Sequence, residues 1–223
     1  ISAGEALPAE VSAAWHKRYG VEIWDGIAST EMLHIFLSNG PGAQKRGTTG
    51  KAVPGYDLRL VGEAGEELGA GEIGELLVCG ASCCNGYWNK RDKTRSTFEG
   101  LWARTGDKYI RDEDGFYQYC GRTDDMFKVS GIWVSPFEVE SALVSHVAVF
   151  EAAVVAHEDD DGLVKPKAFV VLNEGYAIEG LFDELKDHVK AQAGAWKYPR
   201  WIEFLPDLPK TATGKIQRFK LRA

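Results

Sequence analysis

Two short segments carry residue types that could handle a nucleotide. Ser29-Thr30-Glu31 combines hydroxyl groups with a carboxylate, and these hard oxygen ligands suit a phosphate with its Mg²⁺. The Thr-Gly turn that ends in Asp107 places a carboxylate that could accept hydrogen bonds from a ribose diol, as acidic residues do in dinucleotide-binding folds. Each segment alone also has an ordinary interpretation, a helix cap or loop for the first and a simple turn for the second.

Two further segments are charged. The sequence GRTDD, which contains Arg122 and Asp124, is followed closely by KVSG at residues 128–131; a charged cluster of this kind could form a salt-bridged hinge, since hinges lie at the ends of elements, or simply a solvated face. The sequence PKTATGKIQR contains Lys215 in an expected loop of small residues. A lysine ammonium could neutralise charge that develops on a carboxylate and a phosphate, although a surface basic loop is the alternative.

The elements that must position the first segments form a mixed α and β region. Helices are expected at residues 9–18 and 90–98, a short strand at 21–25, and a mixture of loop and helix at 29–38. Alternating apolar runs, joined by turns rich in Gly, Asp and Glu, indicate a small antiparallel β region. Its predicted strands are residues 57–61, 75–79, 109–111 and 115–119.

The pattern changes near Arg122. Ser135, Pro136 and Glu138 form a capping-box arrangement at the start of a helix that is expected to reach residue 146. A second helix, residues 178–193, is closed by Gly194. Strands are expected at 147–156, 167–172 and 201–205. This segment of about 100 residues has the size of a small α+β domain, so we place a boundary between domains 1–123 and 124–223.

Composition and charge narrow the class of protein. The chain is 44% hydrophobic and 26% charged, which is typical of a globular protein with a buried core. The formal net charge of −7 disfavours nucleic acid and anionic membranes as partners, because both are polyanions. The sequence shows neither a run approaching the roughly 20 apolar residues of a membrane span nor a signal peptide.

The cysteines favour reduced thiols in a cytoplasmic protein. None of the four lies in a CxxC spacing or beside a histidine, and two are adjacent, which is awkward for a disulfide framework. They are Cys79, Cys83, Cys84 and Cys120.

Taken together, the segments resemble the acyl-adenylate-forming superfamily, which includes acyl-CoA synthetases, peptide-synthetase adenylation domains and luciferases. The similar core motifs, in the family order, are Gly74-Glu-Leu76, Gly86-Tyr-Trp88, Thr-Gly-Asp107, Gly-Arg122-x-Asp124 and Pro-Lys-Thr-x-x-Gly-Lys215. The resemblance is strongest to benzoate-CoA ligases, on residues 25–39, 124–131 and 210–220. It implies an α/β and α+β fold: the C-terminal part of a large domain, with a sheet and a small β-barrel region, followed by a small mobile lid.

The resemblance also implies roles for individual residues. Asp25, Thr30, Asp107 and Arg122 would bind ATP or AMP; Thr30 and Glu31 would act on the phosphate, with Glu31 as the Mg²⁺ ligand. Asp124 would be the hinge about which the small domain rotates, and Lys215 would be the catalytic lysine of adenylation. After rotation, the loop with Lys128, Ser130 and Gly131 would line the CoA tunnel. The candidates for the acyl pocket are Ala3, Ala28, His34 and Ile35.

The implied activity joins an aromatic carboxylate, benzoate or a close relative, to CoA with ATP, releasing AMP and pyrophosphate. We expect the phosphate loop of the family to lie upstream of Ile1, so that residues 1–223 alone form no acyl-adenylate. A homodimer, and an acetyltransferase and deacetylase that act on Lys215, are further partners that the resemblance suggests.

Three alternatives stay open. The acid could be a hydroxybenzoate or an aminobenzoate, or the enzyme could load a carrier protein instead of CoA. The chain could also be an interaction fragment with vestigial motifs, although Glu31, Asp107 and Lys215 are all present.

Overall fold

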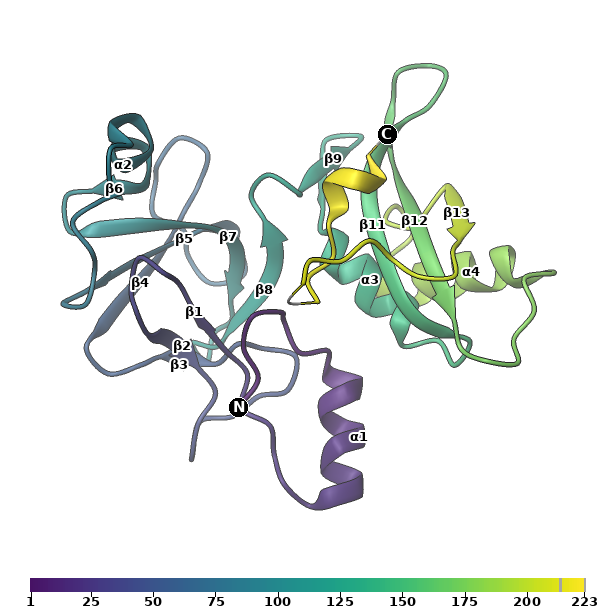
Figure 1. Cartoon of the computed structure of the whole chain (residues 1–223), viewed down its shortest axis with the longest axis horizontal. Coiled ribbons are helices and arrows are strands. Elements are labelled where there is room, and N and C mark those ends of the chain that lie inside the picture. Colours follow the sequence, from purple (N-terminus) through teal and green to yellow (C-terminus); the bar gives the residue numbers. More distant parts are fainter. Residues whose placement is uncertain (213, 223) are drawn as a thin grey trace. The chain divides into compact units, whose positions relative to one another are not determined.

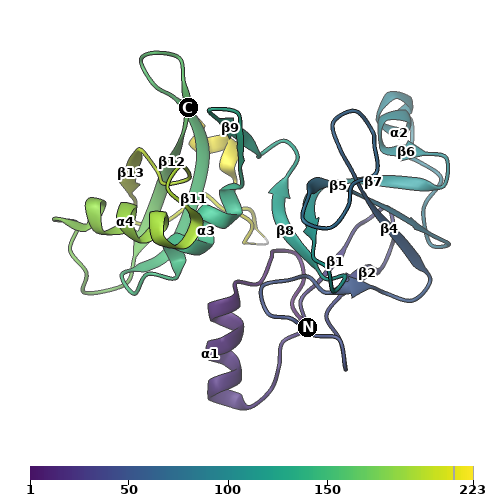
Figure 2. The same cartoon turned by 180° about the vertical axis from the view of Figure 1, so that it is seen from behind.

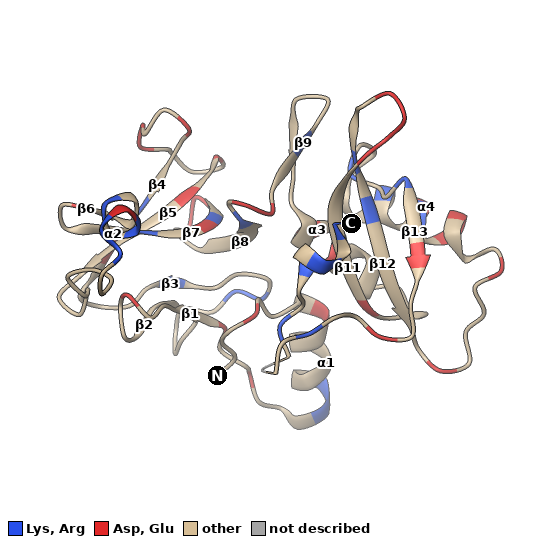
Figure 3. Cartoon of the chain, turned by 45° about the horizontal axis from the view of Figure 1, so that its top comes forward, with Lys and Arg blue, Asp and Glu red and all other residues tan. Residues whose placement is uncertain are grey.

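The computed structural model describes residues 1–212 and 214–222. The chain divides into two compact units, Ile1–Thr123 and Asp124–Ala223, and each has its own hydrophobic core. Both are mixed α and β structures (Figure 1), as the sequence predicts. Acidic and basic residues are interspersed on each unit (Figure 3), so the net negative charge does not come from one acidic region.

The larger sheet of unit 1 is antiparallel, with the order β4-β5-β7-β6 and with β8 paired to β7. The centre of this sheet supplies the core: Leu76, Val78 and Tyr109 are buried completely or nearly so. Its strands are β4 (Tyr56–Val61), β5 (Ile73–Gly80), β6 (Phe98–Glu99), β7 (Trp102–Arg111) and β8 (Tyr117–Arg122). Strands β4, β5 and β7 extend the predicted runs, and β7 continues through the Thr-Gly-Asp motif. Strand β8 starts at Tyr117 rather than at residue 115, and β6 was not predicted.

The second sheet of unit 1 corrects two expectations. Residues 21–25 are not a strand; Asp25 forms only an isolated bridge with Ser2, and β1 begins one residue later. Residues 29–38 contain no helix but a turn followed by a strand. Phe36 and Leu37 are fully buried there, and this burial in a sheet outweighs the helical interpretation of a short apolar run. The strands are β1 (Gly26–Ala28), β2 (Ile35–Ser38) and β3 (Lys51–Ala52).

The helices of unit 1 lie close to their predicted positions. They are α1 (Ala9–Tyr19) and α2 (Arg91–Thr97). Helix α1 ends at Gly20, whose φ of 68° is the left-handed conformation that glycine adopts readily, and its N–H bonds to the carbonyl of His16 at 2.8 Å.

Unit 2 has helices on one face of a three-stranded sheet with the order β11-β12-β13, in which β12 pairs antiparallel with β11 and parallel with β13. Val154 and Val170 share a core with the two helices, whereas Val155 and Phe169 pack on the opposite face with Leu208. The elements are β9 (Phe127–Val129), β10 (Ile132–Val134), α3 (Pro136–Val144), β11 (Val149–Glu158), β12 (Val164–Leu172), α4 (Leu181–Ala193), β13 (Trp201–Phe204) and the 3₁₀ turn η1 (Arg218–Leu221). Figures 1 and 2 label all of them except β10 and η1.

The ends of the unit 2 helices follow local signals closely. The Ser135 hydroxyl accepts the N–H of Glu138 at 3.1 Å, so the predicted cap of α3 is present. Helix α4 stops before Gly194, as expected, but starts at Leu181 rather than at residue 178. In the described part of the chain no helix has the length and apolarity needed to cross a membrane.

Candidate active site

Asp25 precedes β1 and is buried, with 6% of its surface exposed. Burial raises the pKa of its carboxyl group to about 6, and hydrogen bonds from the Leu7 and Gly26 backbone and the Thr49 side chain only partly offset this effect. Its Oδ1 atom is buried without a hydrogen-bond partner among the described residues. An orphaned buried oxygen is costly, so this position suits a polar group donated by a ligand.

The turn between β1 and β2 carries the predicted phosphate residues. Ser29 accepts the N–H of Met32 through its hydroxyl oxygen at 3.2 Å, which closes the turn. Thr30 is exposed in this turn, and Leu33 further along has a φ of 58°, an uncommon left-handed conformation for leucine. Thr30 therefore lies on the surface of unit 1.

Glu31 is held from both ends. The Tyr87 hydroxyl donates a short hydrogen bond to its Oε1 atom, and the N–H of Cys84 donates to its backbone carbonyl at 2.8 Å. Burial alone would raise the pKa of Glu31, but the Tyr87 hydrogen bond and smaller contributions outweigh burial, so the pKa is lowered. Glu31 is thus an ionised, oriented carboxylate, which is the donor type that Mg²⁺ prefers.

Asp107 and Arg122 face each other across β7 and β8. Their side chains form an ion pair with 3.2 Å between Arg122 Nη1 and Asp107 Oδ1, and the same guanidinium nitrogen donates to the Thr105 carbonyl at 3.1 Å. Gly106, between Thr105 and Asp107 in the sequence, has a φ of 72°, and a Cβ there would lie 2.8 Å from Arg122 Nη2. The Thr-Gly-Asp turn and Arg122 therefore form one structural unit, in which the left-handed backbone at Gly106 favours glycine.

The candidates for the acyl pocket are only partly brought together. Ala28 and Ile35 are cross-strand partners, and the ring of His34 lies 6.3 Å from that of Tyr56, nearly parallel to it. Nδ1 of His34 lies 2.6 Å from the Ile35 carbonyl. Ala3 follows the bridge between Ser2 and Asp25 at the other end of β1.

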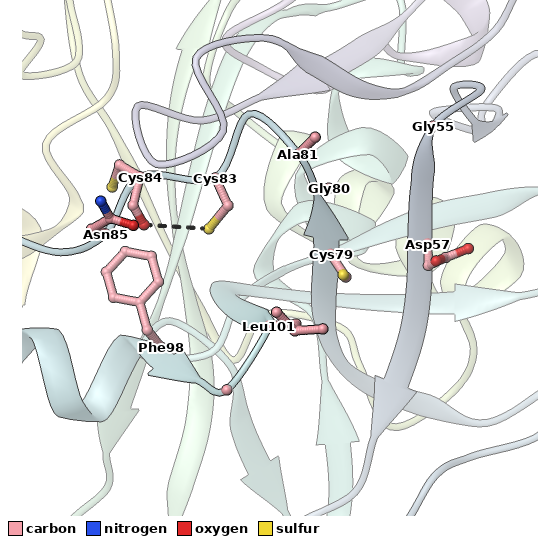
Figure 4. A pocket seen from close by; sticks show the side chains of 11 residues that line it. Gly55, Asp57, Cys79, Gly80, Ala81, Cys83, Cys84, Asn85, Phe98 and Leu101 are labelled. Atoms are coloured by element: carbon pink, nitrogen blue, oxygen red, sulfur yellow. Dashed lines mark hydrogen bonds between the residues drawn. The ribbon is translucent and has the colours of Figure 1, made fainter.

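A pocket of about 530 Å³ lies elsewhere in unit 1 and includes none of the predicted site residues. Cys79, Cys83 and Cys84 approach it from β5 and the following loop, with Phe98 and Leu101 on another side (Figure 4). Burial raises the pKa of the Cys83 thiol, so its reactive thiolate form is disfavoured.

The candidates for CoA binding lie on the β9–β10 hairpin of unit 2. Ser130 and Gly131 form its turn with φ values of 49° and 83°. Lys128 and Trp133 are cross-strand partners, and the ammonium of Lys128 lies 4.6 Å from the centroid of the indole ring. Asp124, the predicted hinge, is exposed at the first position of unit 2.

Lys215 lies on an exposed loop with its own hydrogen bonds. Its backbone carbonyl accepts the N–H of Thr211 at 2.8 Å, and its N–H donates to the Thr211 hydroxyl at 3.1 Å. Ile216 forms an isolated antiparallel bridge with Lys210. The loop is thus a small hairpin that presents the lysine to solvent, and Thr213 within it lies outside the described residues.

Sequence reasoning assigned no role to two residues that lie beside candidate residues, Tyr87 beside Glu31 in space and Arg218 close to Lys215 in the sequence. Tyr87 belongs to a quoted motif, yet only the structure shows its bond to Glu31. Arg218 lies in the C-terminal basic segment and pairs with buried Glu140. A tyrosine hydroxyl in an apolar motif, and a glutamate on the buried face of a predicted helix, were the available signals.

Comparison with known proteins agrees with these features. Residues 1–88 match the family model described as AMP-binding enzyme, and residues 138–215 match that of the AMP-binding enzyme C-terminal domain. The chain belongs to the AMP-binding enzyme family, and its predicted membership of the acyl-adenylate-forming ligases is confirmed.

Within that family the chain is similar to ligases of aromatic acids. It is 61% identical to a 4-hydroxybenzoate–CoA/benzoate–CoA ligase of Rhodopseudomonas palustris and 62% identical to a benzoate–CoA ligase of Thauera aromatica, in each case over 100% of this chain and 42% of the relative. The chain therefore spans less than half the length of these relatives.

Two solved structures are similar over nearly the whole chain. One is the anthranilate CoA ligase AuaEII in complex with anthranoyl-AMP, with a TM-score of 0.93 and 52% identity over 99% of this chain and 42% of that one. The other is a benzoate CoA ligase from Burkholderia xenovorans LB400, with a TM-score of 0.92 and 56% identity over 100% of this chain and 45% of that one.

Proposed function

We propose that the chain is the C-terminal portion of an AMP-forming ligase that converts benzoate or a close aromatic acid, ATP and CoA to aroyl-CoA, AMP and pyrophosphate. The observation that carries this proposal is the 61% and 62% identity, along the entire chain, to two ligases whose names share benzoate as the acid. The paired and buried carboxylates of unit 1 and the exposed lysine of unit 2 supply the groups that such a reaction needs.

Unit 1 would bind the nucleotide. Asp107, which the Arg122 ion pair keeps in place, would accept hydrogen bonds from the ribose hydroxyls, and Asp25 would use its orphaned oxygen to accept another. Thr30 would donate its hydroxyl to a phosphate oxygen. This division follows from chemistry, since a carboxylate accepts from hydroxyl groups whereas a phosphate requires donors.

Glu31 would hold the Mg²⁺ that accompanies ATP. The lowered pKa of Glu31 and the hydrogen bond from Tyr87 fit this assignment, because a cation needs an ionised carboxylate in a fixed orientation. When bound, the ion supplies positive charge that offsets the charge of the phosphates.

Lys215 would act in the first half-reaction. There a carboxylate oxygen of the acid bonds to the α-phosphorus of ATP, the bond to the bridging oxygen breaks, and pyrophosphate leaves with that electron pair. Both reacting groups are anionic, so a cation near the α-phosphate lowers the repulsion between them. The exposed loop position of Lys215 suits a group that must reach a substrate.

Unit 2 would present a different surface in the second half-reaction. There the CoA thiolate attacks the acyl carbon and AMP leaves. We propose a rotation about Asp124 that exchanges the Lys215 loop for the β9–β10 hairpin, with Lys128, Ser130 and Gly131 beside the pantetheine chain. The positive φ values at Ser130 and Gly131 support this role, because they let backbone approach a ligand closely.

Benzoate-dependent exchange of pyrophosphate with ATP, followed by aroyl-CoA formation, tests the activity in the complete enzyme that carries this chain. Benzoate should be the best of a panel that includes 4-hydroxybenzoate, 3-hydroxybenzoate, anthranilate and acetate. Absence of exchange with every aromatic acid would contradict the proposal.

A second candidate substrate is anthranilate. The specific observation in its favour is the 52% identity and the TM-score of 0.93 to an anthranilate CoA ligase. A ratio of kcat/KM for anthranilate over benzoate above one in the same panel would select this candidate.

We also propose that acetylation of Lys215 regulates adenylation. The side chain is exposed on a loop, and acetylation would remove the charge that the first half-reaction uses. An acetylated enzyme with an unchanged rate of pyrophosphate exchange would contradict this idea.

A further inference from the structure

The loop that carries Lys215 ends at an ion-pair cluster on η1. Arg218 donates from Nε to Glu140 Oε1 at 3.0 Å and from Nη2 to Glu140 Oε2 at 2.7 Å. This two-point contact fixes a guanidinium in orientation as well as in position. The third nitrogen, Nη1, lies 3.9 Å from Asp125 Oδ2. We refer to Arg218, Glu140 and Asp125 together as the Arg218 clamp.

The clamp is built into the core of unit 2. Glu140 is 6% exposed on helix α3, and its Oε1 also accepts the N–H of Val154 on the edge strand β11 at 2.8 Å. Asp125 in addition pairs with Arg222. The carboxylates that hold Arg218 are therefore tied to a helix, a strand and the residue that follows Asp124.

Only two residues separate Arg218 from Lys215. Gln217 donates its N–H to the Pro209 carbonyl at 2.8 Å, and Lys210 bridges to Ile216, so the two sides of the small hairpin are joined just before the clamp. Small residues form the rest of the loop. The clamp therefore fixes the C-terminal end of the hairpin, while Ile216 packs on the apolar cluster around Leu208 and Lys210 pairs with Glu151 on the other side.

We propose that Arg218 is a positioning residue for Lys215: the Arg218 clamp fixes the end of the loop so that the lysine is presented in one orientation for adenylation. This inference rests on the role proposed for Lys215. Its physical basis is that a long exposed side chain on a loop of small residues samples many positions, and that displacement of a reacting group by about 1 Å costs on the order of 100-fold in rate.

The test uses the complete enzyme that carries this chain and measures the two half-reactions separately. Arg218→Lys keeps the charge but loses the two-point contact, and should lower benzoate-dependent pyrophosphate exchange by about tenfold; Arg218→Met should lower it by about 100-fold. Thioester formation from supplied benzoyl-AMP should stay within about twofold of the unchanged enzyme.

A second measurement reports on position rather than on activity. Hydrogen exchange at the amides of Thr211 and Lys215, which bond within the loop, should become faster in both Arg218 variants, while exchange in β11 and β12 stays slow. Because Arg218→Met leaves Glu140 as an unpaired buried charge, the double variant Arg218→Met/Glu140→Gln keeps the test valid if the single variant unfolds.

Arg200→Lys is the matched control. Arg200 is in the same unit, and its guanidinium carbon lies 3.8 Å from the Tyr198 ring centroid, away from the Lys215 loop in the sequence. The control should change neither half-reaction. Equal losses in both half-reactions of Arg218→Lys together with a lowered Tm would show a purely structural role and overturn the proposal.

Lys215→Ala, assayed in parallel, separates this inference from the function beneath it. If Lys215→Ala leaves pyrophosphate exchange intact, the proposed role of Lys215 is wrong. Lys215→Ala could instead abolish pyrophosphate exchange while the Arg218 variants keep both full pyrophosphate exchange and slow hydrogen exchange at the loop amides. In that case only the positioning role of Arg218 is wrong.

Discussion

In unit 1 the charged candidate residues are buried or paired, whereas in unit 2 the candidate lysine, Lys215, is exposed on a loop. Asp107 is fixed by Arg122, and Glu31 by Tyr87. Lys215 is exposed, and the loop that carries it is fixed at its end, at Arg218. The difference fits the roles proposed for the two units: groups that bind a nucleotide would gain from a fixed geometry, while a cation needed for only one of two steps would have to leave.

The largest effect is expected at Lys215. Lys215→Ala should lower pyrophosphate exchange by about 100- to 1000-fold, because a preorganised charge at the transition state is removed. Thioester formation from supplied benzoyl-AMP should stay nearly unchanged. The rates of the two half-reactions, measured separately in the complete enzyme, test this prediction. Equal losses in both rates would contradict the proposed difference between the two units.

The next effect is expected at Asp107. Asp107→Asn should lower kcat/KM for ATP by roughly 10- to 100-fold, which corresponds to about 1.5–3 kcal/mol for hydrogen bonds to a charged group. Unlike Lys215→Ala, it should also weaken the binding of AMP. Calorimetric titration with AMP measures this difference, and an unchanged affinity would remove Asp107 from the nucleotide site.

A pH-dependent effect on stability is expected at Asp25. The pKa of its carboxyl group is raised from 3.8 to about 6 in the folded chain, so the folded state binds more protons between these values. The stability that the neutral form contributes is fully present below about pH 4 and is lost as the pH rises through about 6.

Asp25→Asn, which cannot ionise, should therefore stabilise unit 1 by roughly 1–3 kcal/mol at pH 7.5 and by much less at pH 4. Denaturant unfolding of this chain at both pH values checks the sign. A loss of stability at both would mean that hydrogen bonds to the carboxylate outweigh the cost of its burial.

The smallest effect is expected at Tyr87. Tyr87→Phe removes the hydrogen bond to Glu31 but keeps the ring, and loss of one such bond costs about 1 kcal/mol, or roughly fivefold in rate. The Mg²⁺ concentration for half-maximal pyrophosphate exchange should rise by a similar factor. Tyr56→Phe is a matched control, since Tyr56 bonds to Ser82 rather than to a carboxylate.

The fold was predictable where the signals are local. The Ser135 cap, the glycine that ends α4 and the turn between β7 and β8 all depend on residues within a few positions of one another. Strand β2 was missed, because a short apolar run such as Ile35–Ser38 has no periodicity that separates a strand from a helix. Its pairing with β1 and burial in the core decide the outcome.

The candidate site divides in the same way. The order of motifs in the sequence was sufficient to predict the family and to select Glu31, Asp107, Arg122 and Lys215. The contacts that hold Glu31 and the end of the Lys215 loop were not predictable, because Tyr87 is 56 positions from Glu31 and Arg218 is 78 positions from Glu140.

The sequence by itself thus determined the chemical groups of this protein, the ends of several helices and the family to which it belongs. Only the tertiary structure decided which carboxylate is buried, which is paired and where the lysine loop is anchored. The physical reason is range: caps and turns depend on neighbouring residues, whereas burial and ion pairing depend on sheet register and packing, which bring distant parts of the chain together.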